Sequence, residues 1–320
     1  MHKITREAMR TFLGKCSSPR HLFNKKQRNG CATPSLRRDC RKHLKIMGFA
    51  DRVSPSCWLA NGTGLDRFSG SIVALFPTRD FQAENSIVGL EKSSHSLHTI
   101  CSTFHQIGIH SHFCIPQVSA EDEPFGLDWQ TMQLGTPVDS PYESLDVSLA
   151  RYLRPRERNY NFLRYSTDVS SIPDEQLAEE FLKEHLRVSF QSRFMSEVSD
   201  IDGIFWGSQY TYPLEIKEKT AASDRVLGEF FGLDVGPFVK LAYYAAKRGN
   251  LHSMFVVREI TDTESRELKQ WWFITFDRLA QFASWNQQGG GTNMQGGGST
   301  VVKIPKDQFA PMTKSELEKL

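Results

Sequence analysis

The clearest pattern of hydrophobic and polar positions in this 320-residue sequence begins at Pro173. Apolar side chains recur there at helical spacing behind an acidic first turn, which predicts a helix that begins at Asp174. Three apolar runs with strand character follow, then a second amphipathic helix and another strand. The expected strands are Phe190–Val198, Ile201–Gly207, Thr211–Lys217 and His252–Glu259, and the expected second helix is Val235–Lys247.

The rest of the chain gives weaker patterns. After residue 259 we expect strands at Trp271–Phe276 and Ser299–Ile304, a helix from Asp277 to about Trp285, and a short helix at Lys314–Leu320. Two glycine triplets around Asn293 predict a flexible hairpin, because they lack the Gly-Lys-Ser/Thr ending of a phosphate-binding loop. Before residue 150, Gly70–Phe76 and Ser86–Leu90 predict strands, and the acidic stretch 117–143 predicts a loop or linker.

Composition narrows the class of protein. Hydrophobic residues make up 39 % and charged residues 24 %, as in ordinary globular proteins. No apolar run approaches the roughly 20 residues that cross a bilayer, and no apolar signal region opens the chain. We therefore expect a cytoplasmic protein without membrane association. No G-x-S-x-G motif occurs, and no cysteine lies after Cys114, which disfavours serine and cysteine hydrolases.

Cysteine and histidine residues concentrate in the N-terminal part. Six residues carry zinc-ligand side chains there: Cys16, His21, Cys31, Cys40, His43 and Cys57. They lack the close pairs that preset a tetrahedral site, so scattered free thiols are favoured over a structural Zn²⁺. Five histidines between residues 93 and 114 fix no coordination set either, and we interpret them as surface or core histidines.

Positive charge is concentrated in two places. Residues 1–45 hold thirteen Lys or Arg and two acids, a net of +11, which leaves −9 for the rest of a chain whose total is +2. Such a basic arm is typical of proteins that bind polyanions. Arg151, Arg154, Arg156 and Arg158 form a second cluster beside Tyr152, Tyr160 and Phe162. Either phosphate and base contacts or an ordinary exposed segment would explain this cluster.

The segment that carries chemistry runs from Asp202 to Lys217. Asp202 opens one apolar strand, and Glu215 and Lys217 lie two apart on the next. Glu215 and Lys217 therefore point to one side of the sheet, while Leu214 and Ile216 point into the core. A hairpin would bring Asp202 close to Glu215. The alternative is an exposed hairpin whose charged residues form only an outer face.

Two buried carboxylates repel each other unless a cation neutralises them. A hard divalent ion such as Mg²⁺ binds one or two carboxylates together with water and phosphate. It can polarise a phosphate and lower the pKa of bound water, which a nearby lysine would orient or help to deprotonate. The segment therefore predicts phosphodiester hydrolysis.

Residues 174–260 resemble the core of the PD-(D/E)XK nuclease superfamily, which includes most type II restriction endonucleases. The resemblance makes Asp202 the metal-binding aspartate, Glu215 the second acid, the Ile216 carbonyl a further ligand and Lys217 the catalytic lysine. Ile201 stands where the family motif has proline. The family often adds an acid from the first helix, for which we expect Glu180, with Glu179 and Glu184 as alternatives.

The resemblance also implies the fold and the partners. It implies an α/β (α+β) fold in which helices flank a mixed central β-sheet, with an αβββαβ core. Residues 151–320 would form the nuclease domain, and residues 1–150 a basic DNA-recognition or accessory region. The expected cofactor is Mg²⁺, with Mn²⁺ as a substitute. The expected partners are double-stranded DNA, a second copy in a homodimer, and a cognate DNA methyltransferase that acts separately.

Three functions follow from this interpretation. The leading one is a restriction-type endonuclease that cuts double-stranded DNA at a specific sequence. A structure-specific nuclease of repair or recombination is the second, and a non-catalytic DNA-binding protein on a nuclease fold is the third.

Overall fold

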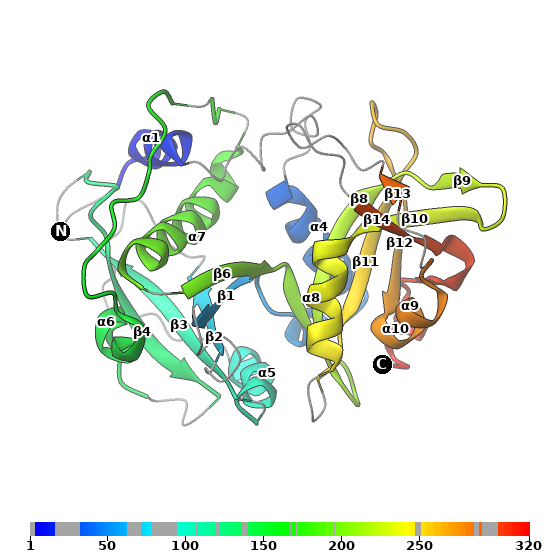
Figure 1. The fold of residues 1–320 in the computed structure, drawn as a ribbon, viewed down its shortest axis with the longest axis horizontal. Coiled ribbons are helices and arrows are strands. Elements are labelled where there is room, and N and C mark those ends of the chain that lie inside the picture. The colour runs from blue at the N-terminus through cyan, green and yellow to red at the C-terminus, as the bar shows by residue number, and fades with distance from the viewer. Residues whose placement is uncertain are drawn as a thin grey trace. The chain divides into compact units, whose positions relative to one another are not determined.

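The computed structural model describes residues 4–16, 33–62, 72–78, 95–106, 108–118, 122–135, 140–166, 168–170, 172–194, 196–246, 251–284, 288–289 and 300–320. Contacts divide the chain into two compact units. Unit 1 contains Met1–Ser35 and Pro55–Asp200, and unit 2 contains Leu36–Ser54 and Ile201–Leu320. Both units combine β-sheets with helices (Figure 1), which confirms the expected class of mixed sheets flanked by helices.

Unit 1 is built on a six-stranded sheet in the order β5-β4-β3-β2-β1-β6. β2 and β3 are parallel and are joined through α5, whereas the β1/β2, β3/β4 and β4/β5 pairs are antiparallel. The strands are β1 (Cys57–Gly62), β2 (Ile72–Pro77), β3 (Ile109–Gln117), β4 (Asp128–Leu134), β5 (Glu143–Ser144) and β6 (Ser196–Ile201). The helices are α1 (Arg6–Lys15), α5 (His95–Gln106), α6 (Leu145–Ser148) and α7 (Asp174–Arg193), with a 3₁₀ turn η3 at Ala150–Tyr152.

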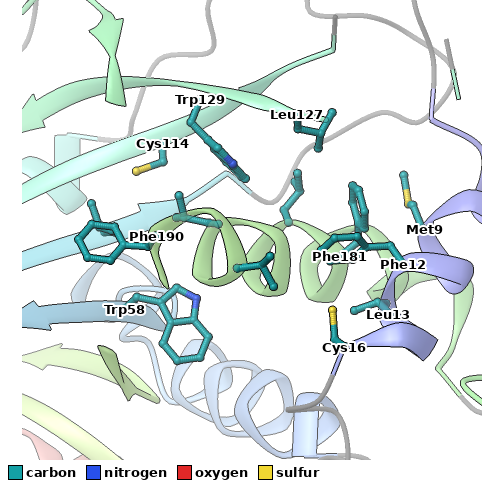
Figure 2. Close-up of a cluster of buried hydrophobic side chains, with 14 of the residues drawn as sticks. Met9, Phe12, Leu13, Cys16, Trp58, Cys114, Leu127, Trp129, Phe181 and Phe190 are labelled. Atoms are coloured by element: carbon teal, nitrogen blue, oxygen red, sulfur yellow. The ribbon is translucent and has the colours of Figure 1, made fainter. Parts of the chain in front are cut away.

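Aromatic side chains dominate the core of unit 1. Figure 2 shows α7 crossing this core, with Phe12 of α1 beside Phe181 and with Trp58 and Trp129 from the strands around the helix. The rings of Phe12 and Phe181 meet edge to face at 5.3 Å, a favoured geometry for aromatic pairs. Trp129 is nearly fully buried, and its indole N–H donates to His185 Nδ1 at 3.1 Å, so its polar edge keeps a partner.

Unit 2 contains a mixed five-stranded sheet and an antiparallel four-stranded sheet, in the orders β15-β12-β11-β8-β7 and β13-β14-β10-β9. The strands of the first are β7 (Gly203–Trp206), β8 (Thr211–Lys219), β11 (Met254–Ile260), β12 (Leu268–Thr275) and β15 (Ala310–Pro311). Those of the second are β9 (Ala222–Asp224), β10 (Gly228–Asp234), β13 (Gln288–Gly289) and β14 (Thr300–Pro305). The helices are α4 (Thr33–Ile46), α8 (Val235–Ala245), α9 (Phe276–Phe282) and α10 (Lys314–Leu317), with 3₁₀ turns η1 (Ala50–Arg52) and η4 (Lys306–Gln308).

The five-stranded sheet is covered on both faces. Leu214 and Ile216 of β8 belong to a cluster with Cys40 and Leu44 of α4 and with Leu317 of α10. The opposite face carries a second cluster, which includes Leu241 of α8 together with residues of β11, β12, β10 and β14. β8 and β11 are parallel neighbours, and parallel neighbours require a crossover, which here contains α8. The sheet therefore lies between α4 and α10 on one face and α8 on the other.

Most elements expected after residue 200 are present with small shifts in their ends. The expected strand Phe190–Val198 is wrong in its first half, because α7 continues to Arg193 and buries Phe190 one turn after Leu186. The acidic stretch 117–143 is also more than a loop: it contains β4, whose Trp129 and Leu134 are buried. The glycine-rich hairpin and the strand expected at Ser86–Leu90 lie outside the described residues, apart from the pairing of β13 with β14.

Two features differ from the expected αβββαβ core. β6, the first of its three strands, joins the sheet of unit 1 beside β1, whereas β7 and β8 belong to the five-stranded sheet of unit 2. β9 and β10 are inserted between β8 and α8. The two compact units are separated after Asp200, and unit 2 also includes Leu36–Ser54. The expected functional regions 1–150 and 151–320 stay a prediction. Among the described residues, no helix is long and apolar enough to cross a membrane.

Candidate functional site

The two predicted acids lie on adjacent segments of the β7–β8 hairpin, Asp202 just before β7 and Glu215 on β8. Gly203 pairs with Leu214 in the antiparallel register, and the N–H of Asp202 donates to the Leu214 carbonyl at 3.2 Å. The described pairing ends at Gly203, and the ladder is irregular at Asp202, because its N–H donates to the same strand position that Gly203 faces. Leu214 and Ile216 are buried in the α4-side cluster, as expected from the alternation of side chains.

Asp202 closes the end of the strand ladder. β7 begins at Gly203, so the N–H of Ile216 lies beyond the last paired residue and needs another acceptor. The Oδ2 atom of Asp202 accepts this N–H at 2.8 Å, and its Oδ1 accepts from Nε of Arg37 at 2.5 Å. The side chains of Arg37 and Asp202 are only 10 % and 8 % exposed, so this ion pair is buried.

Glu215 is held by two lysines. Lys217 Nζ lies 2.7 Å from its Oε1, and Lys240 Nζ of α8 lies 2.5 Å from its Oε2. The carboxylate is 4 % exposed, whereas the lysine side chains are 32 % and 21 % exposed. Lys240 approaches Oε2 without the alignment of a hydrogen bond, so among the described residues this buried oxygen has an ion-pair partner but no hydrogen-bond donor.

The described ion pairs bring three cations to the two carboxylates of the hairpin. Two carboxylates, of Asp202 and Glu215, face three cations, of Arg37, Lys217 and Lys240. Arg37 belongs to the helix on one face of the sheet and Lys240 to the helix on the other, so the two acids are neutralised from opposite sides. The protein therefore supplies the neutralising charge that the sequence led us to expect from a metal ion.

The donor set nevertheless fits a hard divalent ion. A carboxylate offers about four acceptor positions, so an oxygen that already accepts one contact can also bind a cation. The Oε2 atom of Glu215 in particular lacks a hydrogen-bond donor among the residues described. Asp202, Glu215 and the Ile216 carbonyl are the oxygen ligands that Mg²⁺ or Mn²⁺ prefers. A bound ion would have to share these oxygens with Arg37 and Lys240 or displace them.

Lys219 extends the charged row of β8. It follows Glu215 and Lys217 on the same side of the strand. Burial lowers the pKa of Lys219 and nearby Lys217 lowers it further, whereas Asp234 raises it. The face of β8 that carries Glu215 is therefore lined by basic side chains along much of its length.

The structure places the helix acids in the other unit. Glu180 lies on α7 in unit 1 and is buried, so its membership of the site stays a prediction. Glu184 is also buried, and its Oε2 accepts hydrogen bonds from Nε and Nη2 of Arg187 at 3.0 and 2.8 Å. This pair gives Glu184 a structural partner within the helix, whereas Glu179 is only partly buried.

The N-terminal cysteines and histidines are spread over both units. Cys16 and Cys57 are buried in unit 1, whereas Cys40 and His43 lie on α4 in unit 2. Burial and the nearby Asp202 carboxylate raise the pKa of Cys40 to about 12, so its thiol is neutral at physiological pH. His21 and Cys31 lie outside the described residues. Within the described part of the chain, no three His, Cys, Asp or Glu side chains gather as a metal site.

The arginine cluster after residue 150 lies in a mostly extended segment of unit 1. Main-chain N–H groups of Arg154 and Arg158 donate to carbonyls near the end of α7, which fixes the segment along that helix. Arg151 packs over the Tyr152 ring at 4.6 Å, and the Tyr160 hydroxyl accepts from Arg187 at 3.0 Å. Tyr160 and Phe162 pack against the core, so these aromatics serve packing within the unit.

Sequence reasoning missed two residues of the site. Arg37 is one of several arginines in the basic arm, and nothing local distinguishes it from its neighbours. Lys240 did leave a signal, because it is the one charged residue in the sequence VGPFVKLAYYA of α8.

Comparisons with protein-family models, with curated proteins and with solved structures found no significant match. The geometry around the hairpin and the short motif therefore carry the functional argument.

The buried Arg37–Asp202 pair gives a test of this geometry. Replacing Arg37 with Met leaves a buried carboxylate without its guanidinium, which should lower the free energy of unfolding by about 3–5 kcal/mol. Combining Arg37→Met with Asp202→Asn should recover part of that loss. Urea denaturation of the wild type, the two single variants and the double variant gives the coupling energy between the two side chains. Arg52→Met, at an exposed position of η1, serves as control. Equal losses in the Arg37 and Arg52 variants would contradict the pair.

Proposed function

We propose that this protein is a Mg²⁺-dependent endonuclease that hydrolyses phosphodiester bonds of double-stranded DNA. The observation that carries the proposal is the β7–β8 hairpin. Asp202 accepts the N–H of Ile216, the residue after Glu215, at 2.8 Å, and Lys217 reaches the Glu215 carboxylate at 2.7 Å. Both acids are buried at the end of a sheet, where carboxylates are costly unless they serve a charge-bearing function. The resemblance of the motif to PD-(D/E)XK nucleases supports the same reaction.

Each residue then has a distinct role. Asp202, Glu215 and the Ile216 carbonyl would hold the metal ion, with Glu180 as the acid expected from the first helix. The bound ion would polarise the scissile phosphate and lower the pKa of a bound water. Lys217 is the most exposed of the site's three cations, so its Nζ is the one best placed to contact solvent and substrate. We assign it the orientation of the attacking water and charge stabilisation at the phosphate.

The basic segments of the chain suggest DNA as substrate, and the two-fold symmetry of a palindromic site suggests a homodimer. The basic arm of residues 1–45 suits contacts with DNA phosphates, and the arginines after residue 150 suit further contacts with the duplex. Restriction-type cutting of a palindrome would require a homodimer, because a two-fold protein matches a two-fold site. A separate methyltransferase would then protect the cognate DNA in the same cytoplasm.

A non-catalytic DNA-binding protein is the second candidate. The observation in its favour is that Arg37, Lys217 and Lys240 already neutralise both carboxylates without a metal ion. In that case the hairpin would be a structural ion-pair cluster, and Mg²⁺ would change neither DNA binding nor DNA integrity. Cutting confined to branched DNA would instead favour the nuclease of repair or recombination.

Lys217→Ala separates chemistry from binding. The substitution should reduce Mg²⁺-dependent cleavage at least about a hundredfold, because it removes the group that orients water and stabilises charge. DNA affinity, measured by fluorescence anisotropy in Ca²⁺, should change less than about threefold. Lys269→Ala, which removes a lysine that is 52 % exposed on β12, is the matched control and should cleave normally. Full activity of the Lys217 variant would remove this residue from the mechanism.

Neutralising part of the basic arm tests the DNA contacts. Replacing Lys25, Lys26 and Arg28 with Gln should weaken DNA binding and reduce the slope of log K against log salt by up to about 3, roughly 0.9 per lost phosphate contact. Lys314→Gln with Lys319→Gln removes two exposed lysines near the C-terminus and should leave the slope unchanged. An unchanged slope in the arm variant would make the arm a targeting or assembly element.

A further inference from the structure

Lys240 carries a charge that the packing of α8 does not need. The other residues of the helix are apolar or aromatic, and Leu241 and Tyr244 pack it against the protein. Lys240 instead directs its ammonium group to Oε2 of Glu215 at 2.5 Å. The side chain is 21 % exposed, so the lysine could have extended into water.

The Glu215 carboxylate already pairs with a lysine of its own strand, Lys217. Lys217 contacts Oε1 at 2.7 Å, so Lys240 brings a second positive charge to a group that one lysine neutralises. Its contact with Oε2 also lacks the alignment of a hydrogen bond. The second ammonium group therefore lies on the carboxylate oxygen where a divalent ion would meet Glu215.

We propose that Lys240 is a second functional lysine of the site, which competes with the divalent ion for Glu215 and then contacts a substrate phosphate. This inference rests on the proposed nuclease function. Without the ion, the ammonium group contacts Oε2 of the buried carboxylate at 2.5 Å and holds it in place. If a divalent ion took Glu215, the displaced ammonium group would be available to contact a phosphate bound at the same site. Lys240 is thus a positioning residue before metal binding and a substrate contact after it.

The proposal requires opposite effects on metal binding and on cleavage. Removing a positive charge beside a metal ligand should tighten binding of a divalent cation by about tenfold or more. Removing a phosphate contact should slow cleavage at saturating metal by a similar factor. A lysine with only a structural role would instead give weaker metal binding, lower stability, or no change.

The experiment titrates the full-length protein with Mn²⁺ alone, without DNA, and measures free Mn²⁺ by electron paramagnetic resonance. Lys240→Gln and Lys240→Met should both bind Mn²⁺ about tenfold more tightly than the wild type, and Lys240→Arg should restore wild-type affinity. The Met variant keeps the apolar stem, which guards against a folding defect in the Gln variant. Lys303→Gln is the matched control, because Lys303 is 12 % exposed and pairs with Asp224 at 2.6 Å away from the hairpin.

Single-turnover cleavage of DNA at saturating Mg²⁺ completes the test. Slower cleavage by Lys240→Gln together with tighter Mn²⁺ binding supports the proposal. Unchanged or weaker Mn²⁺ affinity in both neutral variants overturns it, even if the wild type cuts DNA. Conversely, tighter Mn²⁺ binding in a protein that cuts no DNA would retain the competition at Glu215 and reject both the nuclease and the phosphate contact.

Discussion

Asp202 and Glu215 are buried at one end of the β7–β8 hairpin, and the need to compensate their negative charges constrains the packing of unit 2. A buried carboxylate is tolerated only when cations and hydrogen-bond donors replace its hydration. Asp202 meets this requirement through Arg37 and the Ile216 N–H, and Glu215 through Lys217 and Lys240. The helices on the two faces of the sheet therefore contribute charge as well as apolar packing. Binding of a divalent ion and a phosphate at this cluster is the proposal that these contacts motivate.

Hydrophobic periodicity predicted the helices and strands whose form depends on residues close together in the sequence. Alternation placed Leu214 and Ile216 in the core, and helical spacing predicted α8. Pairing between distant segments could not be derived in this way. Arg37 contacts an aspartate 165 positions later, and β6 joins the sheet of unit 1 although its sequence directly precedes β7. Phe190 was assigned to a strand because aromatic residues favour strands, yet it continues the buried face of α7.

The helix that carries the predicted third acid has a charged interior of its own. α7 buries an unusual number of charged side chains, including Glu180, Lys183 and Glu184. Trp58 donates to the Lys183 carbonyl at 2.8 Å, and the Lys183 ammonium group lies 4.9 Å from the centre of the Trp58 ring. These contacts anchor the charged face of α7 within unit 1. The acid that the family takes from this helix is therefore part of a charged interior, and its catalytic role is a separate proposal from that of the hairpin.

The most direct test of the account is incubation of the purified protein with phage or plasmid DNA and Mg²⁺, beside Asp202→Asn. Asn keeps the size of the side chain and an acceptor for the Ile216 N–H, but it removes the charge that pairs with Arg37, so circular dichroism must show that the variant is folded. The account predicts discrete DNA fragments from the wild type and intact DNA from the variant. Intact DNA in both reactions, with DNA binding retained, would contradict it and leave the hairpin as a structural ion-pair cluster.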